Sequence, residues 1–400
     1  MVSENQQSLD RCTTWLGNLL TFPTVSSTSN VAISDYVESE LRSLGFQVER
    51  SGYEDDKGVA KANLVAWRNP VGDNPVTGEP QEPDAPSPPA GVAYFCHTDV
   101  VPVTKWSGPG NEPFSATFHE GRVYGRGSCD MKGSLATILS AIQTFDVNDQ
   151  SSPLWVVCTA DEEVGFAGAQ HLVEHSAAYR NLVRHQPLAI IGEPTRLQVH
   201  HAHKGITGFR LTSRGQAAHS STLQGVNANI AMLPLIQLLG DIERRTREDS
   251  RYLDDRFSPP ILSWNFGFSD HMTAVNITPP RCDAWCSLRP MPNIDGADLI
   301  EEVSQLAKKQ DVEITVFDGC PPFWIDADSE FISSLAEMTD SVPSPVCYGT
   351  DGGIFTELKH RVILGPGDIA QAHTADEWIE IDQLARGIRL YQSVLRRFCI

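Results

Sequence analysis

The sequence predicts an α/β protein of two domains. In the larger domain, helices flank a mostly parallel sheet, and a smaller βαββαβ domain of ferredoxin-like type is inserted into it. The chain has 400 residues, 40% of them apolar, which is enough for two hydrophobic cores. Short apolar runs alternate with helical patterns over the first half of the chain, and the order of elements then changes near residue 200. These observations together predict the fold class.

The strands expected in the larger domain are apolar, β-branched or aromatic runs that end in acids or a histidine. They are GVAYFCHTD, PLWVVCTADEE and PLAIIGEP, followed late in the chain by RVILGPG. After Asp130, Leu135, Ile138 and Ile142 recur at helical spacing, FAGAQHLVEH forms another helical pattern, and the last helix ends in YQSVLRRF. Residues 69–91 are rich in proline and acids, so we expect a solvated loop there.

The inserted domain is expected to have the order β-α-β-β-α-β, which is the split βαβ arrangement. Its strands are expected at ITGFRLTSRG, ILSWNFGF, RCDAWCSLRP and VEITVF, and its helices at NANIAMLPLIQLLGDIERR, with Pro234 near a kink, and DLIEEVSQLAKK. We place this domain at residues 197–318. The larger domain then comprises residues 1–196 and 319–400.

Charge and composition exclude several classes of partner. The formal net charge of −20 and the absence of any Lys/Arg-rich block argue against nucleic acid and against anionic membranes. The sequence contains neither a signal-peptide pattern at MVSENQQSLD nor an unbroken apolar run of membrane-spanning length. We therefore expect a soluble, cytoplasmic protein. The nine cysteines stand singly in apolar context, as buried reduced thiols do, and Cys282 and Cys286 favour packing over a metal knuckle.

Ionisable residues gather at the ends of the expected strands. In an extended chain, His97 and Asp99 face the same side, and open α/β sheets bind ligands beyond the carboxyl ends of their strands. One acid after a strand is usually a helix cap or a surface residue. Here, however, seven candidates share one topological place, and they are His97, Asp99, Asp130, Glu162, Glu163, Glu193 and His373.

Two histidines among several carboxylates form a ligand set suited to Zn, Mn or Co. One metal ion cannot use all of them, but a pair about 3.5–4 Å apart and bridged by one carboxylate can. Such a pair polarises a carbonyl and lowers the pKa of water. The spacing alone leaves open which acid has which role.

A motif series resembles that of a known family across nearly the whole chain and in the same order. The motifs are CHTDVVP, GRGSCDMKG, TADEEVG, IGEPT, HAHKG, GQAAHSS, YGTDGG and LGPGDIAQAHTADEW. They are similar to those of the two-metal zinc amidohydrolases that include acetylornithine deacetylase, succinyl-diaminopimelate desuccinylase and glutamate carboxypeptidase. The first of these members is the most similar, chiefly through IGEPT, HAHKG and the LGPG…AH ending.

The resemblance implies the metal ligands and the base. Asp130 would bridge two divalent metal ions, expected to be Zn, with Co or Mn also suited to the ligands. His97 and Glu193 would complete one metal site, and Glu163 and His373 the other. Glu162 would be the general base, and Asp99 would accept the second imidazole N–H of His97. Adjacent residues at a strand end point to different sides, which agrees with separate roles for Glu162 and Glu163.

The resemblance also implies a homodimer and a substrate site. The inserted domain would be a lid and dimerisation domain whose His219 reaches the partner's site. Asn276 would hold the scissile carbonyl. Arg289, whose planar guanidinium suits a carboxylate, would hold the substrate's α-carboxylate together with the loop Gly349–Gly353, through Gly349, Thr350 and Gly352. Two departures from the family pattern lie near the substrate: His271 in FSDHMTAVN, and Asp351 where the deacetylases usually have glutamate.

The expected reaction is removal of the acyl group from an Nα-acyl amino acid. N2-acetyl-L-ornithine, in arginine biosynthesis, is the substrate that the resemblance favours. A desuccinylase, a general acylamino acid hydrolase and a dipeptidase are alternatives on the same scaffold. A non-catalytic binding protein is a further alternative, but such a protein would be free to lose Glu162.

Overall fold

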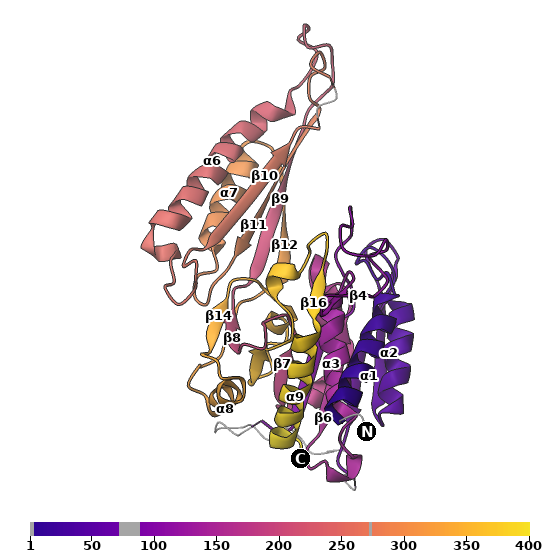
Figure 1. Cartoon of the computed structure of the whole chain (residues 1–400). Coiled ribbons are helices and arrows are strands. Elements are labelled where there is room, and N and C mark those ends of the chain that lie inside the picture. Colours follow the sequence, from indigo (N-terminus) through magenta and orange to yellow (C-terminus); the bar gives the residue numbers. More distant parts are fainter. Residues whose placement is uncertain (1–3, 72–88, 272–273) are drawn as a thin grey trace. The chain divides into compact units, whose positions relative to one another are not determined.

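The structure is a computed structural model that describes residues 4–71, 89–271 and 274–400 (Figure 1). Most of the loop expected at residues 69–91 lies outside these residues. The chain forms two compact units: unit 1 contains residues 1–202, 325–344 and 350–400, and unit 2 contains residues 203–324 and 345–349. The sequence placed these divisions near residues 197 and 318. In the structure β8 (His200–His203) still pairs with the sheet of unit 1, which carries the first division further along the chain.

Unit 1 is built on a mixed sheet. From one edge inward, its order is β1-β2-β6-β3-β7-β15-β8. The strand bounds are β1 Gln47–Glu54, β2 Ala60–Arg68, β3 Val92–His97, β6 Leu154–Thr159, β7 Leu188–Ile191 and β15 Arg361–Ile363. The central strands β6, β3, β7 and β15 run parallel, whereas β1, β2 and β8 pair antiparallel with their neighbours. The predicted α/β class is confirmed, and the parallel part of the sheet is its centre.

The central strands are buried along their whole length, which explains their continuous apolar sequences. The chain leaves β3 to form β6 on one side of it and then returns to form β7 on the other. The carboxyl end of β3 is therefore a topological switch point, where open α/β sheets bind their ligands. His97 is the last residue of this strand.

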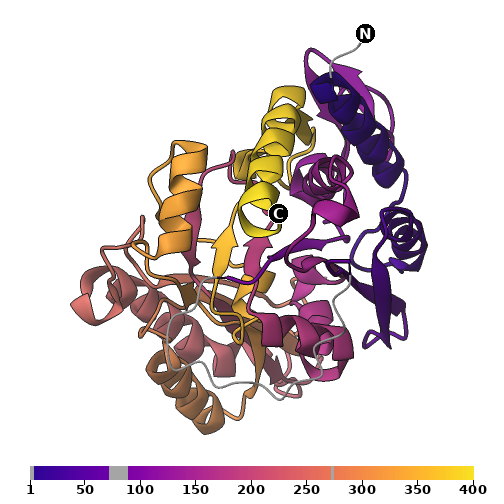
Figure 2. The ribbon, with the colours of Figure 1, turned by 90° about the horizontal axis from the view of Figure 1, so that it is seen from below.

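Helices cover both faces of this sheet (Figure 2). On one face, α1 (Glu4–Leu20), α3 (Gly133–Ile142) and α9 (Ile381–Phe398) contact one another over a core that includes Tyr94 and Val156. All ten residues of α3 are buried, so this helix has no solvent-exposed side. α2 (Val31–Ser43) and α8 (Glu330–Thr339) add residues to the same core.

On the opposite face, α4 (Ala167–His175) and α5 (Ala177–His185) lie against β1 and β2. Phe95 and Tyr179 both contact the ring of Phe355, and Trp155 contacts His185 on α5. Successive residues of β3, Tyr94 and Phe95, thus serve different cores, as the alternation of side chains along a strand requires.

Several short elements complete unit 1. A three-stranded antiparallel sheet has the order β16-β5-β4, with β4 at Thr117–His119, β5 at Arg122–Tyr124 and β16 at Trp378–Glu380. Two further strands lie where the chain passes between the units: β13 (Phe323–Trp324) at the end of the first segment of unit 2, and β14 (Ser344–Val346) at the end of the segment 325–344 of unit 1.

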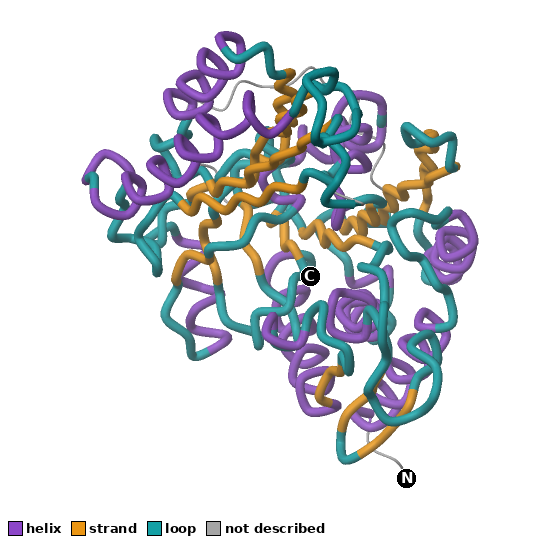
Figure 3. The backbone as a smooth tube through the Cα atoms, turned by 90° about the horizontal axis from the view of Figure 1, so that it is seen from above, coloured by secondary structure: helices purple, strands orange, loops and turns teal. Residues whose placement is uncertain are grey.

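Unit 2 has the predicted order β-α-β-β-α-β, which is confirmed (Figures 1 and 3). Its elements are β9 Ile206–Arg214, α6 Ala228–Glu248, β10 Ser263–Ser269, β11 Arg281–Arg289, α7 Ala297–Lys309 and β12 Glu313–Cys320. The sheet order is β10-β11-β9-β12 with every pair antiparallel, and α6 and α7 pack against each other and share its core. Pro234 lies inside α6.

The cysteines are free thiols, and all except the half-buried Cys347 are buried. Cys282 and Cys286 point to the core of unit 2 from alternate positions of β11, so they are packing residues as expected. Within the part of the chain that the structure describes, no helix is long and apolar enough to span a membrane.

Candidate active site

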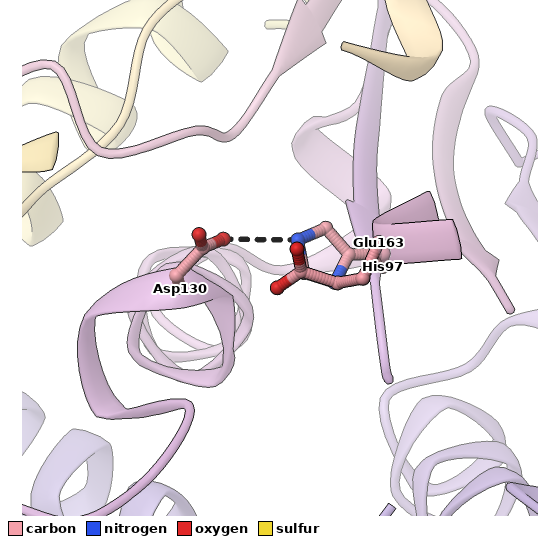
Figure 4. A group of neighbouring side chains, drawn as sticks. All are labelled: His97, Asp130 and Glu163. Carbon is pink, nitrogen blue, oxygen red and sulfur yellow. Dashed lines mark hydrogen bonds and ion pairs between the residues drawn. The ribbon is translucent and has the colours of Figure 1, made fainter. Parts of the chain in front are cut away.

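His97 lies buried at the carboxyl end of β3, between two aspartates. Its Nδ1 atom is 3.0 Å from the backbone oxygen of Asp99, and its Nε2 atom is 3.0 Å from Oδ1 of Asp130 (Figure 4). A carbonyl can only accept, so the proton of this first contact is on Nδ1, which leaves Nε2 directed at Asp130. The nearest carboxylate oxygen of Asp99 is 3.7 Å from Nδ1, beyond hydrogen-bonding distance. The backbone of Asp99 therefore orients His97, in place of the carboxylate that the sequence suggested.

The Asp99 carboxylate supports the adjacent acidic pair instead. It accepts a hydrogen bond from the hydroxyl of Ser26 at 2.7 Å and from the backbone N–H groups of Glu162 at 3.2 Å and Glu163 at 3.4 Å. Those two glutamates form a single 3₁₀ turn, Glu162–Val164, directly after β6. Asp99 thus connects the ends of the neighbouring strands β3 and β6.

Asp130 stands between the two predicted histidine ligands. It lies in the turn Ser128–Lys132 that leads into α3, and it is 6% exposed. Its Oδ1 atom contacts His97, and its Oδ2 atom is 3.4 Å from Nε2 of His373. His373 is also 3.0 Å from Oε2 of Glu163. Four of the predicted ligands are therefore joined in one chain of contacts.

The ligand atoms of His97, Asp130 and Glu163 all lie within 4.8 Å of one another, close enough for a single ion to contact all three (Figure 4). Glu193, which follows β7, is buried and interacts electrostatically with Asp130, His97 and Glu163. The structure thus brings together the five predicted ligands, all from unit 1.

The carboxylate of Glu162, like that of Glu193, forms no hydrogen bond or ion pair among the residues that the structure describes. Its backbone N–H donates to Asp99 and its backbone oxygen accepts the N–H of Gly165 at 3.4 Å, while its side chain is half-buried. Burial raises the pKa of Glu162 well above its usual value; His97 opposes the rise, and Glu193 adds to it. A free carboxylate whose pKa is raised can take up a proton, as a general base must.

The electrostatics of the cluster fit a bound cation. Burial raises the pKa of Glu193 and of Glu163, and Asp130 raises both further. For Asp130 itself, burial favours the neutral form, but hydrogen bonds from His373 and His97 outweigh burial and lower its pKa. Several buried carboxylates thus share two imidazoles as their only nearby cationic partners among the predicted ligands. A bound cation would offset this excess of negative charge. Mixed imidazole and carboxylate donors suit zinc-like metals.

The loop after β14 contributes a buried polar turn. The hydroxyl of Thr350, which is fully buried, accepts the N–H of Gly352 at 3.1 Å and so caps the turn Asp351–Gly353. Asp351 accepts a hydrogen bond from Thr159 at 2.5 Å, and burial raises the pKa of Asp351 to about 7. Asp351 interacts with Glu162 and Glu193, so it belongs to the surroundings of the cluster, where sequence reasoning had left its role open.

The remaining candidates belong to unit 2. The backbone of His219 bridges to Ile277, and Ser220 N–H donates to the carbonyl of Asn276 at 3.0 Å, so the structure brings the segments of His219 and Asn276 side by side. Both residues are exposed. Arg289 is the half-buried last residue of β11, and Gly349 packs near Cys320.

His271, the residue that departs from the family pattern, has a local partner. Its Nε2 atom is 2.7 Å from Oδ2 of Asp283 on β11, which also accepts from Arg281 at 2.8 Å and from Thr212 at 2.7 Å. Two residues of its motif, 272 and 273, lie outside the described residues.

Sequence reasoning missed two buried ion pairs that support the ligand turns. Lys61 Nζ is 2.6 Å from Oδ1 of Asp161, the residue before Glu162, and Tyr53 donates to the same carboxylate at 2.8 Å. Glu377 pairs with Arg126 beside the Asp130 turn. The only signals in the sequence were the acids themselves, Asp161 in TADEEVG and Glu377 in HTADEW.

Comparison with known proteins agrees with this architecture. Residues 93–397 match the model of peptidase family M20/M25/M40. The chain is 33% identical over 395 residues to acetylornithine deacetylase of Myxococcus xanthus, with 96% of each chain covered. It is 30% identical over 399 residues to acetylornithine deacetylase of Proteus mirabilis, with 96% of this chain and 95% of that one covered. A dipeptidase from Saccharomyces cerevisiae has the same fold, with a TM-score of 0.74 at 15% identity over 99% of this chain and 98% of that one.

The fold and these relatives define a hydrolase that acts on an amide bond. The chain belongs to peptidase family M20/M25/M40. The family expected from the motif series is thereby confirmed.

Proposed function

We propose that the protein removes the acyl group from an Nα-acyl amino acid with the help of two divalent metal ions, and that its substrate is N2-acetyl-L-ornithine. The observation that carries the proposal is the position of Asp130 between His97 and His373, beside a glutamate whose carboxylate is free. The similarity to acetylornithine deacetylases over 96% of the chain supports the choice of substrate.

The residues present fit two metal ions. Asp130 has two oxygen atoms directed at different histidines, as a bridging carboxylate requires. His97 and Glu193 would hold one ion, and Glu163 and His373 the other. This donor set suits Zn, and it also accepts Co or Mn. When bound, such ions polarise the scissile carbonyl and make the attacking water more acidic.

The protein's own residues move the proton. Glu162 takes a proton from the water that attacks the carbonyl carbon, and it delivers that proton to the nitrogen of the departing amine when the C–N bond breaks. Asp99 keeps Glu162 in place through the backbone N–H. The products are a carboxylic acid, here acetate, and the free amino acid, here L-ornithine.

Substrate contacts are assigned by motif. Arg289 and the turn with Gly349, Thr350 and Gly352 would hold the α-carboxylate, because a guanidinium and backbone N–H groups both suit that anion. Asn276 would bind the scissile carbonyl, and His219, supplied by a partner subunit, would stabilise the tetrahedral state.

A homodimer is supported by the surface of unit 2. Exposed apolar side chains gather on the first half of α6 and the segment before it, where Ile230 is 64% exposed, Leu233 57% and Val226 56%. Contiguous exposed apolar residues of this kind are typical of protein interfaces. The net charge of −20 supports the absence of nucleic acid as a partner. The proposed reaction would place the enzyme in arginine biosynthesis in the cytoplasm.

A substrate panel tests the proposal. The kcat/KM values for N2-acetyl-L-ornithine, N-acetyl-methionine, N-succinyl-diaminopimelate and a simple dipeptide would be compared with Zn and with Co. We expect a preference for acetyl-ornithine of about tenfold or more, or about 1.4 kcal/mol. Equal use of acetyl-methionine would leave a broader acylamino acid hydrolase, and a clear preference for the succinyl substrate or the dipeptide would contradict the assignment.

A further inference from the structure

A carboxylate outside the predicted ligand set holds the turn that carries Asp130. Glu377 is fully buried, and each of its oxygens accepts two hydrogen bonds. Oε1 accepts the backbone N–H groups of Cys129 at 2.9 Å and Asp130 at 3.0 Å, and Oε2 accepts Nη1 of Arg126 at 2.5 Å and the N–H of Gly127 at 3.0 Å. A carboxylate offers about four acceptor positions, so all of them are used.

The same ion pair reaches the loop of a second ligand. Glu377 lies four residues after His373, and Arg126 donates from Nη2 to the backbone oxygen of Thr374 at 3.0 Å. The backbone N–H of Gly125 donates in turn to the carbonyl of Glu377 at 3.0 Å. The segments 125–130 and 373–377, which are far apart in sequence, are therefore joined by six hydrogen bonds, all donated by the first segment and accepted by the second.

Arg126 and Glu377 hold the backbone of the two ligand segments. The side chain of Arg126 is 3% exposed and that of Glu377 is 1% exposed, and neither residue is among the predicted ligands. A guanidinium and three backbone N–H groups facing one site require an ionised carboxylate, because a protonated one would direct its own hydrogen at a donor. Removing that charge leaves donors without acceptors next to Asp130.

We infer that Glu377 and Arg126 are positioning residues that set Asp130 and His373 at the separation at which both can bind the same metal ion. The inference rests on the metal centre of the proposed function. Residues behind the ligands of a metal site commonly act in this way, and their loss costs about 10–100-fold in metal affinity or activity.

Glu377→Gln tests the inference, because the glutamine has the same size but presents an amide N–H₂ to the donors. Apo protein would be titrated with Zn²⁺ or Co²⁺ by calorimetry, and the visible spectrum of the Co²⁺ form would be recorded. We expect affinity for at least one ion to fall about 10–100-fold and the Co²⁺ spectrum to change. These readouts need no substrate, so absence of metal binding by the wild type would refute the proposed function separately.

Glu49→Gln is the matched control. The Glu49 carboxylate also holds a turn, since it accepts the hydroxyl of Ser176 at 2.5 Å and the N–H of Ala178 at 3.0 Å at the start of α5, but that turn carries no ligand. Glu49→Gln should lower the melting temperature of the apo protein and leave metal affinity unchanged. If Glu377→Gln behaved in the same way, Glu377 would be merely structural and the inference would be wrong.

Arg126→Lys tests the positioning role of the ion pair if Glu377→Gln does not fold. Lysine keeps the charge beside Glu377 but cannot also reach the carbonyl of Thr374 with the geometry of a guanidinium. We expect weaker metal binding, with the greater loss at the ion that His373 and Asp130 share. Unchanged metal affinity and an unchanged Co²⁺ spectrum in a folded Arg126→Lys protein would overturn the inference.

Discussion

The candidate residues that follow the strands of unit 1 are buried, whereas those in the loops of unit 2 are exposed. In unit 1, His97, Asp99, Asp130 and Glu193 are each 2–6% exposed and lie at the ends of parallel strands or in the turns beside them. In unit 2, His219 and Asn276 occupy exposed loops, and large apolar side chains are exposed nearby. Buried charges must be paired or bound to a cation, whereas exposed groups need no partner in their own unit. The predicted metal ligands are thus brought together within unit 1, whereas His219 and Asn276 are open to solvent in unit 2.

The largest effect is expected at Glu162 of unit 1. Glu162→Gln should keep both metal ions, because Glu162 is not among the proposed ligands, and should lower kcat by about 10²–10⁴ through lost proton transfer. Metal content and turnover would be measured on the same sample. Glu163→Gln is the contrasting variant, and we expect it to lose metal because its carboxylate contacts His373. Loss of metal from Glu162→Gln instead would reverse the roles of the two glutamates.

The second prediction concerns unit 2. His219→Ala should lower activity by about 10²–10³, the range found when one hydrogen-bond donor to a tetrahedral intermediate is removed. Mixing it with Asp130→Ala subunits should restore part of the activity, because one site of the mixed dimer has intact ligands and receives His219 from the other chain. His271→Ala, which changes another exposed histidine of unit 2, should retain near-normal turnover. If activity were not restored after verified subunit exchange, His219 would act in the site of its own subunit or take no part in the reaction.

The smallest effect is expected in how the stability of unit 2 depends on pH. Burial favours the neutral form of Asp283, but hydrogen bonds from Arg281, Thr212 and His271 outweigh it and lower its pKa to about 2. A lowered pKa contributes stability above the ordinary pKa of an aspartate, and that stability is lost as pH falls toward about 2. The ion pairs are partly exposed, so we expect only about 1 kcal/mol.

Asp283→Asn tests this pH dependence. The variant should be less stable than the wild type at pH 5, and the difference should shrink toward pH 3. Thermal unfolding of the full chain at both values measures it, and about 1 kcal/mol corresponds to a few degrees in a chain of this size. A difference that is constant with pH would mean that the charge of Asp283 does not contribute.

The strand ends were predictable because local pattern determines them. A buried parallel strand must be apolar until its last residue, so His97, Glu193 and the acids after β6 were visible as interruptions. The βαββαβ order of unit 2 was predictable for the same reason, because the spacing of apolar residues within each short segment distinguishes its strands from its helices. The metal roles of individual acids came from the motif resemblance, and they stay predictions.

The supporting contacts could not be predicted because they depend on backbone groups. Nothing in the sequence tells whether the carbonyl or the carboxylate of Asp99 faces His97, and the structure has the carbonyl in that place. The four donors around Glu377 are three backbone N–H groups and an arginine about 250 positions away. Only a folded chain brings such groups together.

The position of β15 has a consequence for synthesis of the protein on the ribosome. This strand lies between β7 and β8 in the sheet, yet all of unit 2 is translated before it. At about 5–20 residues per second, the edge of β7 is exposed for on the order of 10–30 s before residues 361–363 emerge. An open edge of apolar strand invites pairing with other chains. The nascent protein is therefore open to mispairing at this edge while unit 2 is translated, and His373 can join the other predicted ligands only after it has left the ribosome.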